Sequence, residues 1–277
     1  MGSPGWCCTY PPPHSSERLR AQLAPTPLAV VEHLGHRQRR DVAVLDVGIT
    51  GIIGPNGSGK TTLFNLIAGN LKSSSGNVIF DNEDITNVPS YELFSKGLLR
   101  TFQIAHEFSN LSVLENLMMV PADQSGENLI NNFLKPNLIK TEEQKVKEKA
   151  KEVVEFLNLG HLTNELAGNL SGGQKKLLEL GRTMMVDAKL VLLDEVGAGV
   201  NRTLLKDLGT AIDKLNKEKG YTFCMIEHDM DFIGRLCDPV IVMAEGSVLF
   251  EGKVEDAKKD QKVIESYLGR GSKLKEK

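Results

Sequence analysis

Apolar and polar positions follow two periods along this chain of 277 residues. Short apolar runs suit buried strands, whereas apolar residues that recur every three or four positions suit helices. The strand pattern is clearest at 49–53, 189–193 and 221–226. The strongest helix signals lie within 104–169, and another helix is expected near 203–218. Strands and helices therefore alternate, and we expect an α/β fold.

Shorter patterns predict the remaining elements. Residues 76–81 alternate as a strand does, and residues 90–99 fit a short helix. Residues 239–252 fit a hairpin that turns at Gly246. A last helix is expected at about 255–268.

Two helix starts are predicted within 104–169. Leu111–Leu117 suits one of them, and the capping-box spacing of Thr141 and Gln144 predicts a second helix that begins at Thr141. That helix would end at Gly160. Its predicted apolar face consists of Val146, Ala150, Val153, Val154 and Leu157.

The first 50 residues differ in composition from the rest of the chain. They contain five Arg and no Lys, and they hold six of the eleven prolines. Because the prolines deny residues 1–27 a regular element, we expect a disordered leader there. Short strands are expected within 30–34 and 42–47, and residues 270–277 are expected to form a flexible tail.

Charge and cysteine usage narrow the class of protein. The net charge of −3 gives no support for a nucleic-acid partner. No apolar run approaches the roughly 18 residues of a transmembrane helix, so we do not expect the chain to span a membrane by itself. The cysteines lack metal-type spacing, which favours reduced thiols in a cytosolic protein; they are Cys7, Cys8, Cys224 and Cys237.

Residues 54–62 fit the phosphate-binding pattern G-x-x-x-x-G-K-[ST]. The stretch follows an apolar run and precedes a helical pattern, as this interpretation requires. Glycines let successive N–H groups point at phosphate oxygens, and the helix N-terminus adds partial positive charge. We expect Lys60 to reach the β- and γ-phosphates and the Thr61 hydroxyl to ligate Mg²⁺.

Another predicted helix opens with Leu170-Ser171-Gly172-Gly173-Gln174. Ser171 and Gln174 have capping-box spacing, so both glycines fall in the first turn. Each glycine costs the helix about 1 kcal/mol relative to alanine. Capping alone would not require two glycines, whereas bare backbone at a helix N-terminus suits close approach of an anion.

Two predicted strands end in polar residues. Asp194 and Glu195 follow one of them, and unpaired carboxylates are costly at the end of a core strand. Beside a phosphate-binding loop, Asp194 is expected to bind Mg²⁺ and Glu195 to polarise the attacking water. The strand at 221–226 leads to His228, a candidate contact of the γ-phosphate, because ligands of open α/β sheets gather at carboxyl ends of strands. A solvent-exposed strand end and a surface histidine are the alternatives.

The order of these motifs resembles that in the nucleotide-binding subunit of ABC transporters, over about residues 51–269. Some details are similar to one of the two ATPases of branched-chain amino-acid importers. They are Arg100-Thr101-Phe102-Gln103, Ala198-Gly199-Val200-Asn201, Ile226-Glu227-His228-Asp229-Met230 and Tyr267-Leu268-Gly269. The resemblance implies a P-loop NTPase core with a mostly parallel sheet, a truncated antiparallel β subdomain and a helical subdomain at about 104–175. The nucleotide-binding domain would cover residues 28–269.

The same resemblance implies an ATPase that uses ATP and Mg²⁺. The implied nucleotide-binding residues are Gly54, Pro55, Asn56, Gly57, Ser58, Gly59, Lys60, Thr61, Thr62, Gln103, Ser171, Gly172, Gly173 and Gln174. Thr61, Gln103 and Asp194 are the implied magnesium ligands. Glu195 would be the general base, and His228 would hold the γ-phosphate.

The implied partners are a second ATPase subunit, identical or related, and integral membrane permeases. Ser171, Gly172 and Gly173 would contact the γ-phosphate bound by the opposite subunit in a head-to-tail dimer. A groove beside the helical subdomain would receive a cytoplasmic helix of a permease, and a solute-binding protein outside the membrane would take part indirectly. The chain would therefore lie peripherally on the cytoplasmic face of the plasma (inner) membrane and power the import of a small solute, namely a branched-chain or other amino acid.

Alternative functions are a soluble ABC ATPase that acts on nucleic acid or ribosomes, and a subunit of a urea, amide or lipopolysaccharide transporter. The first class usually carries two ATPase units or a coiled-coil insertion, and this chain has neither. One feature departs from the family, since no aromatic residue lies between Tyr10 and Phe64 to stack on adenine. His36 or Arg37 could stack instead, and we expect weakened ATP binding.

Overall fold

The structure is a computed structural model that describes residues 29–32, 42–45, 48–101, 107–122, 124–127, 134–186 and 188–268. The leader predicted at 1–27 and the tail predicted at 270–277 lie outside these residues, as do His36, Arg37 and Gln103. Within the described ranges, no helix combines the length and the apolar character that crossing a bilayer requires.

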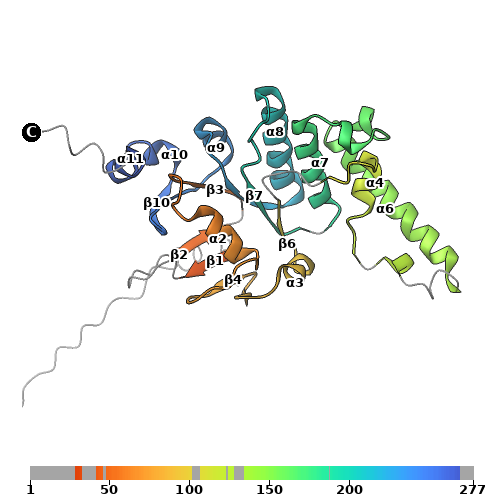
Figure 1. Ribbon diagram of the computed structural model, residues 1–277, viewed down its shortest axis with the longest axis horizontal. Helices are drawn as coiled ribbons and strands as arrows, with labels where there is room; N and C mark the ends of the chain where they lie inside the picture. The colour runs from red at the N-terminus through yellow and green to blue at the C-terminus, as the bar shows by residue number, and fades with distance from the viewer. Residues whose placement is uncertain are drawn as a thin grey trace, which may run out of the picture.

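A six-stranded sheet forms the centre of the molecule (Figure 1), with the strand order β10-β9-β3-β8-β7-β6. Its strands are β3 (Ile49–Ile53), β6 (Leu98–Arg100), β7 (Leu190–Asp194), β8 (Thr222–Ile226), β9 (Val240–Ala244) and β10 (Ser247–Gly252). The five strands from β9 to β6 are parallel, and β10 pairs antiparallel with β9. The carboxyl ends of β3, β7 and β8 therefore meet at one edge of the sheet.

A smaller antiparallel sheet has the order β2-β1-β4-β5. Its strands are β1 (Ala29–Glu32), β2 (Val42–Leu45), β4 (Val78–Phe80) and β5 (Glu83–Asp84). The antiparallel pairing agrees with the predicted antiparallel β subdomain. Figure 1 shows the sheet beside α2 (Lys60–Ile67), and buried side chains of β4 and α2 share one core cluster.

The helices differ in length and cover both faces of the central sheet. Besides α2 they are α3 (Ser90–Ser95), α4 (Val113–Met118), α6 (Pro136–Phe156), α7 (Gly172–Met184), α8 (Arg202–Lys219), α9 (Met230–Leu236), α10 (Val254–Ala257) and α11 (Gln261–Leu268). Short 3₁₀ turns occur at Ser125–Glu127, Gly160–Leu162 and Ala167–Asn169. In Figure 1, α4 and α6 lie at the opposite end of the molecule from α11.

Alternation along β7 shows how the sheet is buried on both sides. Leu190 and Leu192 belong to the core cluster that contains α2, whereas Val191 and Leu193 belong to the cluster that contains α7 and α8. All five residues of β7 are buried. Burial on both faces is what produces a continuous apolar run in a parallel strand.

Three predicted helix boundaries are wrong: both ends of α6 and the end of α3. The helix α6 ends at Phe156 instead of Gly160, and Asn158 beyond it has a left-handed φ of 56°. The helix α6 begins at Pro136 instead of Thr141, because proline is well suited to the first helical turn and Thr141 continues the helix by donating to the carbonyl of Asn137. The helix predicted at 90–99 ends at Ser95, since Gly97 has a left-handed φ of 88° and Leu98–Arg100 pair with β7.

The last predicted helix, 255–268, consists of two helices. The first, α10, ends at Ala257, and α11 begins at Gln261. Between them, the Asp260 carboxylate accepts a hydrogen bond from the N–H of Val263 at 3.0 Å. A side-chain acceptor at this position caps a helix N-terminus, so Asp260 starts a new helix.

Candidate functional site

The loop at 54–59 joins β3 to α2, and its first residue has no space for a side chain. Gly54 has φ +152°, and a Cβ placed on it would lie 2.2 Å from the carbonyl oxygen of Met243. Gly59, just before α2, is left-handed with φ 101°. Both positions therefore require glycine, and the close approach of the backbone explains why the predicted phosphate-binding pattern contains glycines there.

Lys60 lies at the N-terminus of α2 and is buried. Its Nζ donates to the carbonyl oxygens of Gly54 at 2.8 Å and Pro55 at 3.1 Å. Burial lowers the pKa of Lys60, and the charges of Glu195 and Asp194 oppose that shift. The ammonium group is thus held inside the loop, where an anion would meet it together with the helix N-terminus.

A polar cavity of about 320 Å³ opens onto this loop. Its lining residues are Asn56, Gly57, Ser58, Gly59, Lys60, Thr61, Thr62, Glu195 and His228. The fold therefore brings the loop together with the predicted base and the predicted γ-phosphate contact. Gly54 and Pro55 lie behind this lining, where their carbonyl groups bind Lys60.

Asp194 ends β7 and is held by Arg100, which ends the neighbouring strand β6. Arg100 Nη2 lies 2.8 Å from Asp194 Oδ2, and the two side chains are 11% and 2% exposed. Arg100 also donates to Asn65 of α2 at 2.5 Å and lies over the ring of Phe64, 5.8 Å from its centre. The other carboxylate oxygen, Asp194 Oδ1, is buried without a hydrogen-bond partner in the described part of the chain. One oxygen of Asp194 is thus fixed by Arg100, and the other remains for a ligand.

Glu195 and His228 come from the ends of adjacent parallel strands and meet there. Glu195 has φ 49°, a left-handed conformation that is uncommon outside glycine, and its N–H donates to the carbonyl of Ile226 at 2.9 Å. Its Oε1 lies 3.1 Å from His228 Nε2. The two side chains, 28% and 50% exposed, can both reach a group in the cavity.

Sequence reasoning assigned no role to Arg100 or Glu227, although both lie in quoted motifs. Glu227 is buried, and its carboxylate accepts hydrogen bonds from the N–H groups of Gly197 and His228. Burial raises the pKa of Glu227, and those two donors oppose the shift. The signal in the sequence that could have identified Glu227 is an acidic residue directly after an apolar strand.

The helix tip at 171–174 has the predicted local structure. Ser171 and Gln174 form a capping box, and both glycines lie in the first turn of α7. A Cβ on Gly172 would have no neighbour closer than the Gly199 carbonyl oxygen at 4.0 Å, whereas one on Gly173 would lie 2.9 Å from Leu204 Cβ. Gly172 thus presents open backbone, and Gly173 allows α7 to pack against α8. None of these residues lines the phosphate cavity described above.

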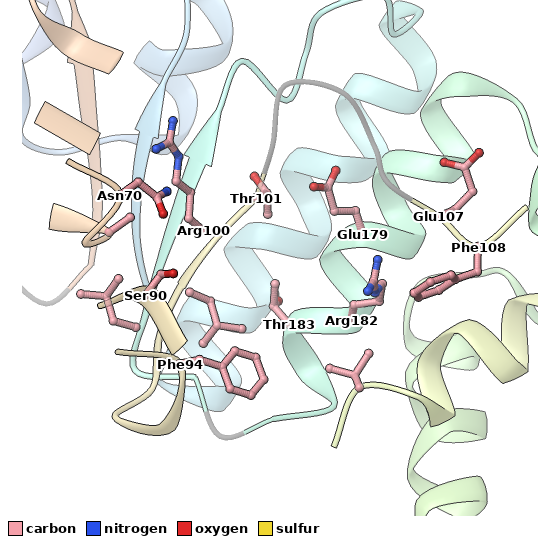
Figure 2. A pocket seen from close by; sticks show the side chains of 14 residues that line it. Asn70, Ser90, Phe94, Arg100, Thr101, Glu107, Phe108, Glu179, Arg182 and Thr183 are labelled. Carbon is pink, nitrogen blue, oxygen red and sulfur yellow. The ribbon is translucent and has the colours of Figure 1, made fainter. Parts of the chain in front are cut away.

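A second cavity, of about 560 Å³, lies between the central sheet and α7 (Figure 2). Its lining residues are Ala68, Asn70, Ser90, Phe94, Leu98, Leu99, Arg100, Thr101, Glu107, Phe108, Val120, Glu179, Arg182 and Thr183. Figure 2 shows Phe94 on one side of the opening and Phe108 on the other, with Arg182 beside the Phe108 ring. The Arg182 guanidinium lies 5.5 Å from that ring centre, and Lys175 pairs with Glu107 at 2.6 Å. Glu107 and Phe108 form one wall of this cavity, which we call the groove. Through Lys175 and Arg182, this wall is bound to α7, the helix that starts at Gly172.

The chain is similar to several known proteins. The family described as "ABC transporter" matches residues 41–198. The chain is 44% identical over 231 residues to a probable branched-chain amino acid transport ATP-binding protein of Archaeoglobus fulgidus, covering 83% of this chain and 88% of that relative. It is 41% identical over 247 residues to a protein of the same description from Methanocaldococcus jannaschii, covering 87% and 95%. A solved ATP-binding cassette of an ABC transporter in its ADP conformation superposes with a TM-score of 0.73 at 37% identity, covering 88% of this chain and all of that chain.

Proposed function

This chain belongs to the ATP-binding subunits of ABC transporters and is an ATPase, and from that premise we propose that it powers the import of branched-chain amino acids through partner permeases. The observation that carries the proposal is the shared cavity of Lys60, Glu195 and His228. It combines an anion-binding loop with a candidate base, two of the parts that recur in enzymes that transfer a phosphoryl group to water. The relatives named above supply the substrate class.

The residues around Asp194 fit a magnesium ion. Asp194 Oδ1 is buried and lacks a partner among the described residues, which is costly unless a cation or donor binds it. Thr61 is exposed and lines the cavity. Carboxylate and hydroxyl oxygens, with phosphate oxygens and water, are the ligands that Mg²⁺ prefers. We assign Thr61 and Asp194 to this site; Gln103, the third predicted ligand, lies outside the described residues. Bound there, the ion would neutralise charge on the β- and γ-phosphates.

The mechanism follows from the placement of the side chains. In it, the N–H groups of residues 56–62 and the Lys60 side chain hold the triphosphate. Glu195 Oε1 accepts a proton from a water molecule as the water oxygen attacks the γ-phosphorus, and the bond from that phosphorus to the ADP oxygen breaks. His228 orients Glu195 through the hydrogen bond at its Nε2. It also orients the γ-phosphate, because its side chain lines the same cavity.

The helix tip at 171–174 completes the site only in a dimer. The open backbone at Gly172 suits a phosphate. None of the residues of this helix tip, however, lines the phosphate cavity of the same subunit. A head-to-tail pair would bring Ser171, Gly172, Gly173 and Gln174 of one subunit to the nucleotide of the other. ATP then bridges the two surfaces, and hydrolysis lets them separate. The second subunit is either another copy or a related ATPase.

The groove in Figure 2 is our proposed docking site for a cytoplasmic helix of a permease. Phe94 and Phe108 would contact its apolar face, and Glu107 and Arg182 line the same groove. Since Lys175 and Arg182 tie this wall to α7, closure of the dimer would move the docked helix. A permease partner places the chain peripherally at the cytoplasmic face of the plasma (inner) membrane, with an external solute-binding protein as an indirect partner.

The alternatives considered from the sequence receive no support from the relatives. A soluble role on nucleic acid or ribosomes, and transport of urea, amides or lipopolysaccharide, appear in none of the names reported above. Co-purification from detergent-solubilised membranes tests the transport role. We expect multi-span permeases to be recovered with the chain, and recovery of ribosomes or DNA in their place would overturn it.

The catalytic assignment is tested with Glu195→Gln, which keeps the size of the side chain and removes the base. With Mg²⁺-ATP, we expect the variant to lose at least about a hundredfold in phosphate release and to accumulate as an ATP-bound dimer in size-exclusion chromatography. Glu165→Gln, on the surface away from the cavity, is the matched control and should behave like the wild type. Unchanged turnover in Glu195→Gln would refute the assignment.

The substrate is tested by reconstituting the chain with its co-purified permeases and solute-binding protein in vesicles. We expect ATP-dependent accumulation of leucine, isoleucine and valine. Accumulation of another solute with no uptake of these three would refute the proposed substrate while leaving the ATPase assignment intact.

A further inference from the structure

Glu227 is a buried acid that has no role in the mechanism proposed above. It follows β8 directly, is 5% exposed, and lies one residue before His228. A carboxylate at such a position is costly unless its oxygens are hydrogen-bonded. Its contacts therefore indicate what the side chain does.

Each oxygen of Glu227 accepts from a different backbone group. Oε1 accepts from the N–H of Gly197 at 2.6 Å, and Oε2 accepts from the N–H of His228 at 3.3 Å. Gly197 lies two residues after Glu195 in the turn that leaves β7. One side chain thus joins the segment that carries Glu195 to the segment that carries His228.

The turn at Gly197 fits closely against this carboxylate. A Cβ on Gly197 would lie 3.2 Å from Glu227 Oε1 and 3.1 Å from Leu205 Cδ1, so the turn has little room to shift. The N–H groups of Gly197 and His228 also reach different oxygens of the Glu227 carboxylate. A glutamine would offer one oxygen and turn its NH₂ group toward a second N–H, which leaves that N–H unsatisfied.

Glu195 needs such an external constraint. Its φ of 49° is left-handed, a conformation that residues other than glycine hold only when surrounding structure enforces it. Two hydrogen bonds fix the turn on both sides of Val196. The N–H of Glu195 donates to the Ile226 carbonyl, and the N–H of Gly197 donates to the Glu227 carboxylate. The contact of 3.1 Å between Glu195 and His228 depends on the relative position of the two segments.

We propose that Glu227 is a positioning residue that holds Glu195 and His228 in register for hydrolysis without touching the nucleotide. The inference rests on the proposed roles of Glu195 and His228. It predicts that loss of Glu227 slows the chemical step, because a displaced base lowers kcat. The affinity for the nucleotide should stay the same, because residues 56–62 still bind the phosphates.

The experiment compares Glu227→Ala and Glu227→Gln with the wild type in full-length protein. We expect kcat for Mg²⁺-ATP to fall at least tenfold in Glu227→Ala and by less in Glu227→Gln, while the Kd of a fluorescent ATP analogue stays within twofold. Asp229→Asn is the matched control. It changes a neighbouring acid whose bonds to the N–H groups of Asp231 and Phe232 an asparagine can also make, so kcat should stay within twofold.

A double-variant cycle separates positioning from general destabilisation. In a His228→Ala background, Glu227→Ala should lower kcat little further, because the contact it holds is already gone. Equal factors in both backgrounds, a parallel loss of nucleotide affinity, or an unchanged kcat in Glu227→Ala would overturn the inference. Absence of ATPase activity in the wild type would instead overturn the proposed function, so the two failures are distinguishable. Glu227→Gln retains the side-chain volume and provides the result if Glu227→Ala does not fold.

Discussion

Replacing Arg100 by methionine should destabilise the protein strongly, because it leaves Asp194 as an unpaired buried charge. The two side chains are 11% and 2% exposed, and their closest atoms are 2.8 Å apart. Removing one partner of such a buried pair typically costs about 3–5 kcal/mol. The bond to Asn65 and the contact over the Phe64 ring are lost as well.

The expected shift in melting temperature follows from this cost. For domains of roughly 150–250 residues, each 1 kcal/mol shifts Tm by about 2–4 °C, so Arg100→Met should melt roughly 6–20 °C below the wild type. The measurement is differential scanning calorimetry without nucleotide or Mg²⁺, so that no ligand replaces the lost cation.

Two further variants test the cause. Lys96→Met removes a surface pair with Glu83, whose side chains are 32% and 61% exposed, and should lower Tm by only about 4 °C or less. Arg100→Met combined with Asp194→Asn removes both charges and should recover part of the lost stability. An Arg100→Met melting temperature within about 3 °C of the wild type, or no recovery in the double variant, would refute the reasoning.

Other predictions concern the helix tip and the thiols. Gly172→Ala should melt no lower than the wild type, because alanine favours the helix and meets no clash, but it should lose at least about tenfold in ATPase activity because the open backbone for the anion is blocked. Gly173→Ala should melt lower because its Cβ would clash with Leu204. Scanning calorimetry and phosphate release check both, and full activity in Gly172→Ala would contradict the anion-binding role. Burial raises the pKa of Cys224 and raises the pKa of Cys237 to about 12. Above about pH 9 the unfolded chain loses these protons while the native state keeps them, so stability should fall as pH rises toward 12. Urea midpoints at several pH values measure this slope; Cys237→Ala should flatten it, and an equal slope in both proteins would contradict the prediction.

Local patterns predicted the elements that build the site. The apolar run at 189–193 became β7, the capping box at Ser171 became the start of α7, and the glycine pattern at 54–59 became the loop before α2. These succeed because period, capping and turn chemistry depend on near neighbours in the chain. The helix starting at Pro136 was missed for the same reason, since the capping-box signal at Thr141 was stronger than that of a lone proline.

Long-range partners could not be read from the sequence. The pairing of Arg100 with Asp194 joins residues that lie in different strands, and the bond of Glu227 to Gly197 joins two turns. Whether a charged side chain is exposed or buried depends on which strands become neighbours, and that is decided by the packing of the whole sheet.

The sequence by itself therefore determined which chemical groups are present: a glycine-rich loop with a lysine, a pair of acids, a histidine and a glycine-rich helix tip, all in fixed order. Only the tertiary structure decided the geometry. Parallel pairing of β3, β8 and β7 brings the loop, Glu195 and His228 to one cavity, while α7 directs its tip elsewhere. The physical reason is that residue type and spacing act through the local backbone, whereas distances between strand ends are set by the burial of both faces of the sheet.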